Sequence, residues 1–257
     1  MRKYVLLIGL SSMVMAGAYW PWSVATLAKS GPRRLLYLTM SAGYKHDIVP
    51  FSRDIVKQIG ERSGAFQTDF ADDVSPFTAE NLRHYDGVMF YTSGELPFTG
   101  VQKQIFMEYM RAGHGFVGVH SATDTCYNWA DYGQMIGGYF DGHPWHQLVT
   151  VDVTDPDNKL TKFLGKSFQI NDEIYQIDDF EAPSTQALLH LDPMSVDRSK
   201  PDVHMRYYNW PLAWTRRWGK GRVFYTAFGH DKAVWEDPRF QELLLNGIKW
   251  SMGDLKE

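Results

Sequence analysis

The stretch Gly115-Phe116-Val117-Gly118-Val119-His120-Ser121-Ala122-Thr123-Asp124 begins as an apolar run and ends abruptly in polar side chains. A short apolar run that stops at a polar turn is typical of a buried strand in a parallel sheet. In open α/β sheets, ligands bind at the carboxyl ends of such strands. The stretch therefore predicts a central strand over residues 115–119, with His120 at the edge where a binding site forms.

Segments of strand and helix character alternate before and after this stretch. Apolar runs over residues 35–40, 66–70 and 87–92 predict strands, and apolar positions at helical spacing predict helices over residues 99–112 and 238–252. Such alternation implies right-handed crossovers and a mostly parallel sheet with helices on both faces. The expected fold class is therefore α/β, in three layers.

The second half of the chain adds strands of a different kind. Residues 148–153 alternate between apolar and polar side chains, which predicts a strand with one solvated face. Residues 210–215 and 222–227 flank Gly219-Lys220-Gly221, a strong signal for a β-hairpin. We therefore expect a C-terminal hairpin that extends the parallel sheet.

The N-terminus has the composition of a targeting segment. Met1-Arg2-Lys3 is basic, residues 4–10 are apolar, and Ala16 and Ala18 have the spacing of a cleavage site. We interpret residues 1–30 as a signal peptide or, because apolar residues persist to about Ala28, as an uncleaved anchor. The remaining residues, 31–257, are expected to form one domain. The predicted location is periplasmic or extracellular, with membrane attachment through the N-terminus as the alternative.

Overall composition excludes some kinds of partner and site. The formal net charge is -4 and no basic block follows the N-terminus, so we expect no nucleic-acid partner. The single cysteine, Cys126, excludes an internal disulfide and a cysteine-rich metal site. Nine tryptophans and fourteen tyrosines could line a sugar-binding cleft, although aromatic residues also fill cores.

A series of short motifs in a fixed order makes the chain resemble a known family. The motifs are Tyr44-Lys45-His46, Gly118-Val119-His120-Ser121-Ala122, Gly137-Gly138-Tyr139-Phe140-x-x-His143-Pro144, Asp172-Glu173-Ile174-Tyr175, Pro211-Leu212-Ala213-Trp214 and the run Gly221–His230. In this order they resemble the ThuA-like family, which is named after trehalose utilisation, over roughly residues 34–252. The resemblance implies a flavodoxin-like fold of the class I glutamine amidotransferase type and a role in sugar metabolism.

The turn after the central strand departs from the amidotransferase pattern. In true amidotransferases this turn carries a nucleophilic cysteine, whereas here it carries His120 and Ser121, and Cys126 comes several residues later. A thiol nucleophile needs a partner base and a fixed position at that turn. We therefore do not expect glutamine amidotransferase activity.

Histidines are concentrated at the predicted strand ends. Neutral imidazole is a common ligand of divalent metals, and several such ligands with water form catalytic zinc sites. We predict His46, His120, His143 and His146 as metal ligands, with zinc as the expected ion and no nucleotide cofactor. The alternative is that these histidines act without metal, as hydrogen-bond donors and a general base toward sugar hydroxyls.

Other residues near the strand ends are candidates for catalysis or substrate binding. The predicted catalytic residues are His120, Glu173 and Asp124. The predicted substrate-binding residues are Tyr44, Glu95, Ser121, Trp145, Tyr175 and His230. Each has a structural alternative: the aromatic rings could pack in the core, the serine could cap a helix, and the aspartate could close a turn.

These observations lead to one functional hypothesis and one alternative. We expect an exported carbohydrate-processing enzyme, a hydrolase or lyase that acts on a glycoside or keto-sugar through a histidine-rich site. The alternative is a non-catalytic carbohydrate-binding protein on an amidotransferase-like scaffold. Both require His46, Glu95, His120 and His230 to converge at one edge of the sheet, because each follows a predicted strand.

Overall fold

The computed structural model describes residues 32–180, 184–205 and 210–256 of the 257-residue chain. The predicted signal peptide or anchor, residues 1–30, lies outside the described residues. Within the described ranges, no helix is both long enough and apolar enough to cross a membrane.

One nine-stranded sheet forms the centre of the molecule, in the order β2-β1-β3-β4-β11-β10-β9-β6-β7. Its strands are β1 (Arg33–Leu38), β2 (Phe66–Ala71), β3 (Gly87–Phe90), β4 (Gly115–Val119), β6 (Trp145–Val153), β7 (Ser167–Ile174), β9 (Thr185–Leu191), β10 (Pro211–Trp218) and β11 (Gly221–Thr226). The pairings from β2 through β11 are parallel, and those from β11 through β7 are antiparallel. β5 (Tyr139–Phe140) and β8 (Ile177–Asp178) form a separate two-stranded sheet.

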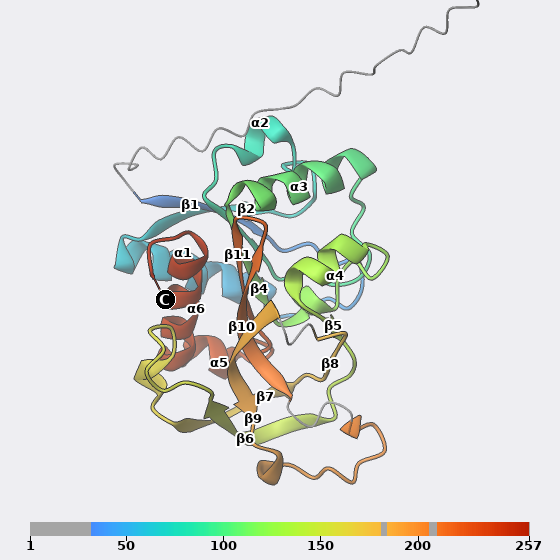
Figure 1. The fold of residues 1–257 in the computed structure, drawn as a ribbon, viewed down its shortest axis with the longest axis vertical. Coiled ribbons are helices and arrows are strands. Elements are labelled where there is room, and N and C mark those ends of the chain that lie inside the picture. Colours follow the sequence, from blue (N-terminus) through green and yellow to red (C-terminus); the bar gives the residue numbers. More distant parts are fainter. Residues whose placement is uncertain (1–31, 181–183, 206–209, 257) are drawn as a thin grey trace, which may run out of the picture.

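Helices cover both faces of the large sheet and make a three-layer structure (Figure 1). They are α1 (Val49–Ser63), α2 (Ala79–Leu82), α3 (Gly100–Ala112), α4 (Ala130–Ile136), α5 (Lys232–Glu236) and α6 (Pro238–Ser251). In Figure 1, α1, α5 and α6 lie on one side of the sheet, while α3 and α4 lie on the other. The α/β class, the mostly parallel sheet and the C-terminal hairpin β10–β11 are thus as predicted from the sequence.

Local sequence signals account for the ends of the principal helices. The Thr99 side chain accepts a hydrogen bond from the Gln102 amide, and the Gln102 side chain accepts one from the Thr99 amide, which begins α3 with a capping box. Asp237 caps α6 in a similar way through the Arg239 amide, and Pro238 supplies its fixed φ in the first turn. Gly64 ends α1 at φ 65°, a conformation that glycine adopts without strain.

The central strand β4 is buried along its whole length between β3 and β11. Helix α6 approaches it so closely at Gly115 that a Cβ atom there would lie 2.8 Å from the backbone of Ser251. The strand ends at His120, which has a positive φ of 48° and begins a short 3-10 helix, His120–Thr123. A non-glycine residue in this region of φ is held there by its surroundings, and such positions cluster at functional sites.

Candidate functional site

Three histidines and a glutamate converge where the parallel strands end. His46 comes from the loop after β1, His120 from the end of β4 and His230 from the segment after β11. Glu173 lies near the end of β7. One nitrogen or oxygen atom of each side chain lies within 4.8 Å of the corresponding atoms of the other three. We call this group the histidine site.

The backbone fixes the orientation of the fully buried His120 ring. Its Nδ1 lies 2.7 Å from the Ala227 carbonyl oxygen, which can only accept a hydrogen bond, so Nδ1 carries the proton. The lone pair of Nε2 therefore points into the site, where the Tyr175 hydroxyl donates to it at 2.9 Å. The carboxylate of Glu173 lies 3.4 Å from the same nitrogen. His120 thus directs Nε2 into the site, between Tyr175 and Glu173.

Asp231 orients His230 in a comparable way. His230 donates from Nδ1 to one oxygen of this carboxylate at 3.0 Å, which leaves Nε2 facing Glu173 at 3.8 Å. The other oxygen of Asp231 lies 2.7 Å from Nε2 of His146. Burial alone would raise the pKa of Asp231, but its bonds to the two imidazoles hold that pKa below its usual value. In turn, the carboxylate raises the pKa of His146.

A second carboxylate, that of Asp172, holds the segment that carries His230. The Asp172 side chain is fully buried, and its two oxygens accept hydrogen bonds from the backbone N–H groups of Gly229 at 2.7 Å and Asp231 at 3.0 Å. Burial raises the pKa of Asp172 to about 6, even though these bonds favour the charged form. The contact links β7 to the end of β11 and fixes the position of His230 beside Glu173.

The pKa values of His46 and Glu173 are both lowered, which favours an uncharged His46 and a charged Glu173. Burial, followed by the nearby rings of His120 and His230, lowers the pKa of His46 to about 3, so this imidazole is neutral at ordinary pH. For Glu173, burial would raise the pKa, but the nearby imidazoles, first His120 and then His230 and His143, hold it below its usual value. The site therefore combines the Glu173 carboxylate with the neutral imidazole of His46.

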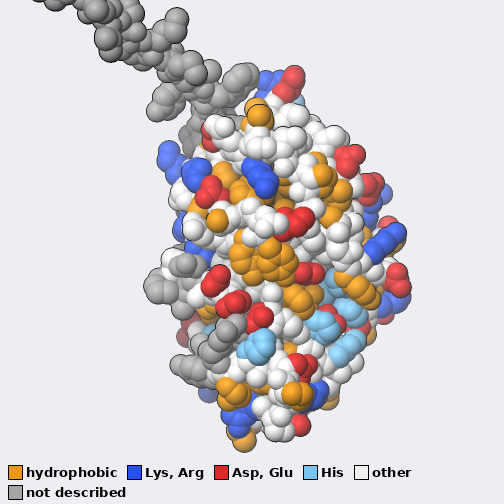
Figure 2. Space-filling view, turned by 90° about the vertical axis from the view of Figure 1, so that its right-hand side faces the viewer, with side chains coloured by type: hydrophobic (Ala, Val, Ile, Leu, Met, Phe, Trp, Pro, Cys, Tyr) orange, Lys and Arg blue, Asp and Glu red, His pale blue; other side chains and the backbone are white. Residues whose placement is uncertain are grey.

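The histidine site opens to solvent through a pocket of about 280 Å³. His46 and His230 line its floor, and the exposed ring of Tyr44 lies at its edge, 4.7 Å from the His46 ring. The half-exposed His143 also contacts the site, with Nδ1 3.2 Å from a Glu173 oxygen. Figure 2 shows histidine side chains gathered on one face of the molecule, beside acidic and hydrophobic side chains.

The donor set fits a small divalent ion. A four-coordinate zinc ion with bonds of about 2.0–2.2 Å would separate its ligand atoms by about 3.3–3.6 Å. One Glu173 oxygen lies 3.4 Å from Nε2 of His120, within that range, and the other oxygen lies 3.8 Å from Nε2 of His230, just outside it. His46 completes a group of four side chains whose ligand atoms all lie within 4.8 Å of one another.

The group of potential metal ligands in the structure differs from the predicted group. His46 and His120 lie together as expected, but their partners are His230, which was predicted to bind substrate, and Glu173, which was predicted to be catalytic. His146 instead forms a second group with His230 and Asp231. His143 contacts Glu173 but is not one of the four grouped side chains.

Several predicted substrate-binding residues do not line the histidine pocket. Trp145 has no exposed surface, packs against Trp210 and donates to the Asp197 carbonyl, so its ring is part of the core and offers no face for stacking on a sugar. Tyr175 is also buried, but it contacts His120 directly. Glu95 lies at the correct edge of the sheet, where it accepts a hydrogen bond from the Asn128 amide.

Ser121 and Asp124 follow His120 but lie beside the site. The Ser121 side chain is fully buried, and its hydroxyl has no hydrogen-bond partner among the described residues. The carboxylate of Asp124 accepts a hydrogen bond from Tyr127 at 2.7 Å, and burial raises its pKa. Neither side chain belongs to the grouped ligands.

Sequence reasoning missed Asp231, which holds both His230 and His146. Its signal was available, because it directly follows His230 at the end of the predicted hairpin strand. An aspartate beside a histidine at a strand end is a candidate for the acceptor that fixes the imidazole tautomer.

Comparison with known proteins gives a family model and several similar structures. The ThuA model, described as trehalose utilisation, matches residues 34–251. A ThuA-like protein from Bacteroides uniformis is 24% identical, with a TM-score of 0.72 over 87% of this chain and 93% of its own. A ThuA-like protein from Parabacteroides merdae is 20% identical, with a TM-score of 0.68 over 86% of this chain and 90% of its own.

One similar structure is part of a larger enzyme. The cold-adapted β-galactosidase from Rahnella sp. R3 is 14% identical, with a TM-score of 0.53 over 86% of this chain and 31% of its own. At these identities the three structures establish a shared fold. The chain has no significant match among curated proteins.

Proposed function

We propose that this chain, which belongs to the ThuA (trehalose utilisation) family, is an exported carbohydrate-processing enzyme. Its substrate is a glycoside or keto-sugar, and its reaction is a hydrolysis or an elimination at the histidine site. The family description supports a sugar substrate, and the signal-like composition of residues 1–30 supports export. We further propose that His46, His120, His230 and Glu173 hold a divalent ion, with zinc as the best fit.

One observation carries the metal proposal. The Nδ1 atoms of His120 and His230 are each held by an acceptor, which leaves both Nε2 lone pairs directed toward Glu173. Metal-binding histidines nearly always donate their other ring nitrogen to a carbonyl or carboxylate in this manner. A bound ion would replace the hydrogen bond that Tyr175 now donates to His120.

The side chains around the histidine site have different roles in the proposed reaction. When bound, the ion would polarise a carbonyl or hydroxyl oxygen of the sugar. His143 is half-exposed beside Glu173, where it can exchange a proton with a substrate hydroxyl. The exposed ring of Tyr44 can lie against the apolar face of a sugar. Asp172 and Asp231 keep His230 in place.

Turnover assays test the proposal. Purified protein is incubated with a panel of glycosides and 3-keto-glycosides, before and after treatment with a chelator and after addition of zinc. We expect turnover that the chelator removes and zinc restores. His120→Ala should lower the rate by more than about a hundredfold, while His190→Ala, on the distant strand β9, should leave it unchanged.

Two outcomes would contradict parts of the proposal. Full turnover by metal-free protein would refute the metal and leave His120 as a metal-free catalytic residue. Saturable sugar binding with no turnover on any substrate would refute the enzyme assignment and favour a carbohydrate-binding protein.

A further inference from the structure

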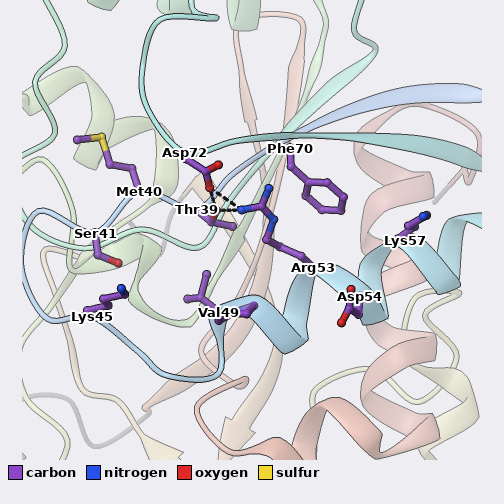
Figure 3. Close-up of a pocket in the computed structure, with 11 residues that line it drawn as sticks. Thr39, Met40, Ser41, Lys45, Val49, Arg53, Asp54, Lys57, Phe70 and Asp72 are labelled. Atoms are coloured by element: carbon purple, nitrogen blue, oxygen red, sulfur yellow. Dashed lines mark hydrogen bonds and ion pairs between the residues drawn. The ribbon is translucent and has the colours of Figure 1, made fainter.

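A second and larger pocket lies on the other side of the loop that carries His46. It has a volume of about 790 Å³, within the range of small-molecule sites, and we call it the α1 pocket. Its walls are the residues that follow β1, the end of β2 and the first turns of α1 (Figure 3). Like the histidine site, it lies at the carboxyl edge of the parallel strands, where ligands bind in this class of fold.

Ion pairs already engage much of the positive charge in the α1 pocket. Arg53 lies 2.5 Å from the carboxylate of Asp72, and its guanidinium also covers the Phe70 ring at 4.6 Å (Figure 3). Lys57 lies 3.9 Å from Glu61 on the next turn of α1. A pocket built for a strongly anionic ligand would keep such cations unpaired. The charge distribution therefore favours an uncharged ligand.

The remaining groups match the surface of a sugar. Lys45 supplies donors, the exposed Asp54 supplies acceptors, and the Ser41 hydroxyl can act as either. Met40, Val49 and Pro50 add apolar surface to the same pocket. A sugar presents hydroxyls that both donate and accept, next to apolar C–H faces. No charge has to be neutralised when such a ligand enters.

One short loop separates this pocket from the histidine site. Tyr44 and His46 line the histidine pocket, whereas Lys45, between them in sequence, lines the α1 pocket. A ligand that crosses this loop would contact both pockets.

We propose that the α1 pocket is a second carbohydrate-binding subsite, which takes an uncharged sugar unit. If the proposed function holds, a substrate of two or more units places its reacting unit at the histidine site and its distal unit here. Sugar binding in the α1 pocket does not depend on that catalytic role.

Backbone NMR of the full chain tests the subsite directly. ¹⁵N-labelled protein is titrated separately with trehalose, glucose and inorganic phosphate. We expect trehalose to shift the amides of Ser41, Lys45, Asp54 and Phe70 in a saturable manner. Asp54→Ala should weaken that binding about tenfold, the effect of one lost hydrogen bond to a charged group. Gln58→Ala, an exposed change on the same helix outside the pocket, should have no effect.

Each other outcome has a defined meaning. Shifts confined to the histidine pocket, or no shifts with either sugar, would overturn the subsite. Phosphate binding to these amides more tightly than either sugar would also overturn it, because the pocket would then be an anion site. His120→Ala separates the two proposals: sugar binding in the α1 pocket should survive this change even if the histidine site has no catalytic function.

Discussion

Burial of His46 should make the stability of the metal-free protein sensitive to mild acid. The side chain is 6% exposed, and burial followed by the nearby His120 and His230 lowers its pKa from 6.5 to about 3. Below pH 6.5 the unfolded chain takes up a proton at His46 that the folded chain does not. The unfolded state therefore binds more protons, and the free energy of unfolding falls as the pH drops from 6.5 toward 3.

The size of this effect follows from the two pKa values. Each pH unit between them costs about 1.36 kcal/mol, so a drop to about pH 4.5 removes roughly 2–3 kcal/mol from the folded state. Asp172 has the opposite effect on how the free energy of unfolding depends on pH. Its folded pKa is raised to about 6, so its contribution is fully present at low pH and is lost as the pH rises through that value. A comparison of variants is therefore needed to isolate His46.

Urea unfolding of wild type and His46→Gln at about pH 7.5 and about pH 4.5, with chelator present, makes this comparison. The difference in unfolding free energy between the two proteins should shift by roughly 2–3 kcal/mol in favour of His46→Gln at the lower pH. His84→Gln, which removes an exposed histidine, is the matched control. The same pH response in wild type and His46→Gln would refute the reasoning.

Two further substitutions test the site and the core. Asp231→Asn should weaken zinc binding by about tenfold to a hundredfold, because it removes the carboxylate that holds Nδ1 of His230; isothermal titration measures this, and unchanged affinity would contradict the role of Asp231. Gly115→Ala should destabilise the fold by about 1–3 kcal/mol, because the new Cβ would lie 2.8 Å from the backbone of Ser251. Gly100→Ala, whose Cβ would meet no atom within 4 Å, is the control in urea unfolding, and equal stability of the two variants would contradict the packing argument.

The sequence predicted the local elements better than their arrangement. Residues 115–119 form the central strand as expected, because a buried strand carries its own apolar signal. Strand β6 begins at Trp145, three residues before the predicted start at 148, because Trp145 and His146 pair with Ile174 and Glu173 of β7. Apolar and polar side chains alternate only weakly at the beginning of this segment. The start of β6 is therefore fixed by its pairing with β7. Pairing between distant strands is not encoded in either strand alone.

In the candidate site, too, residues placed by local signals were predicted better than those placed by the pairing of distant strands. His46, His120 and His230 converge as predicted, because His120 directly follows a parallel strand and the other two lie in the segments after parallel strands β1 and β11. Glu173 was expected near the site, but its place between His120 and His230 depends on antiparallel strands whose order the sequence does not reveal. Trp145 illustrates the limit for aromatic residues. Its ring type suits both a cleft and a core, and only packing against Trp210 decides between them.

The metal content of the full chain tests the central claim most directly. Elemental analysis of protein purified without chelator, compared with His120→Ala and with Glu173→Gln, would measure bound zinc per chain. We predict about one ion per wild-type chain and a loss of most of it in both variants, because each change removes one of four grouped ligands. Wild-type protein without metal that also fails to take up added zinc, or variants that retain a full ion, would contradict the assignment of the histidine site as a metal centre.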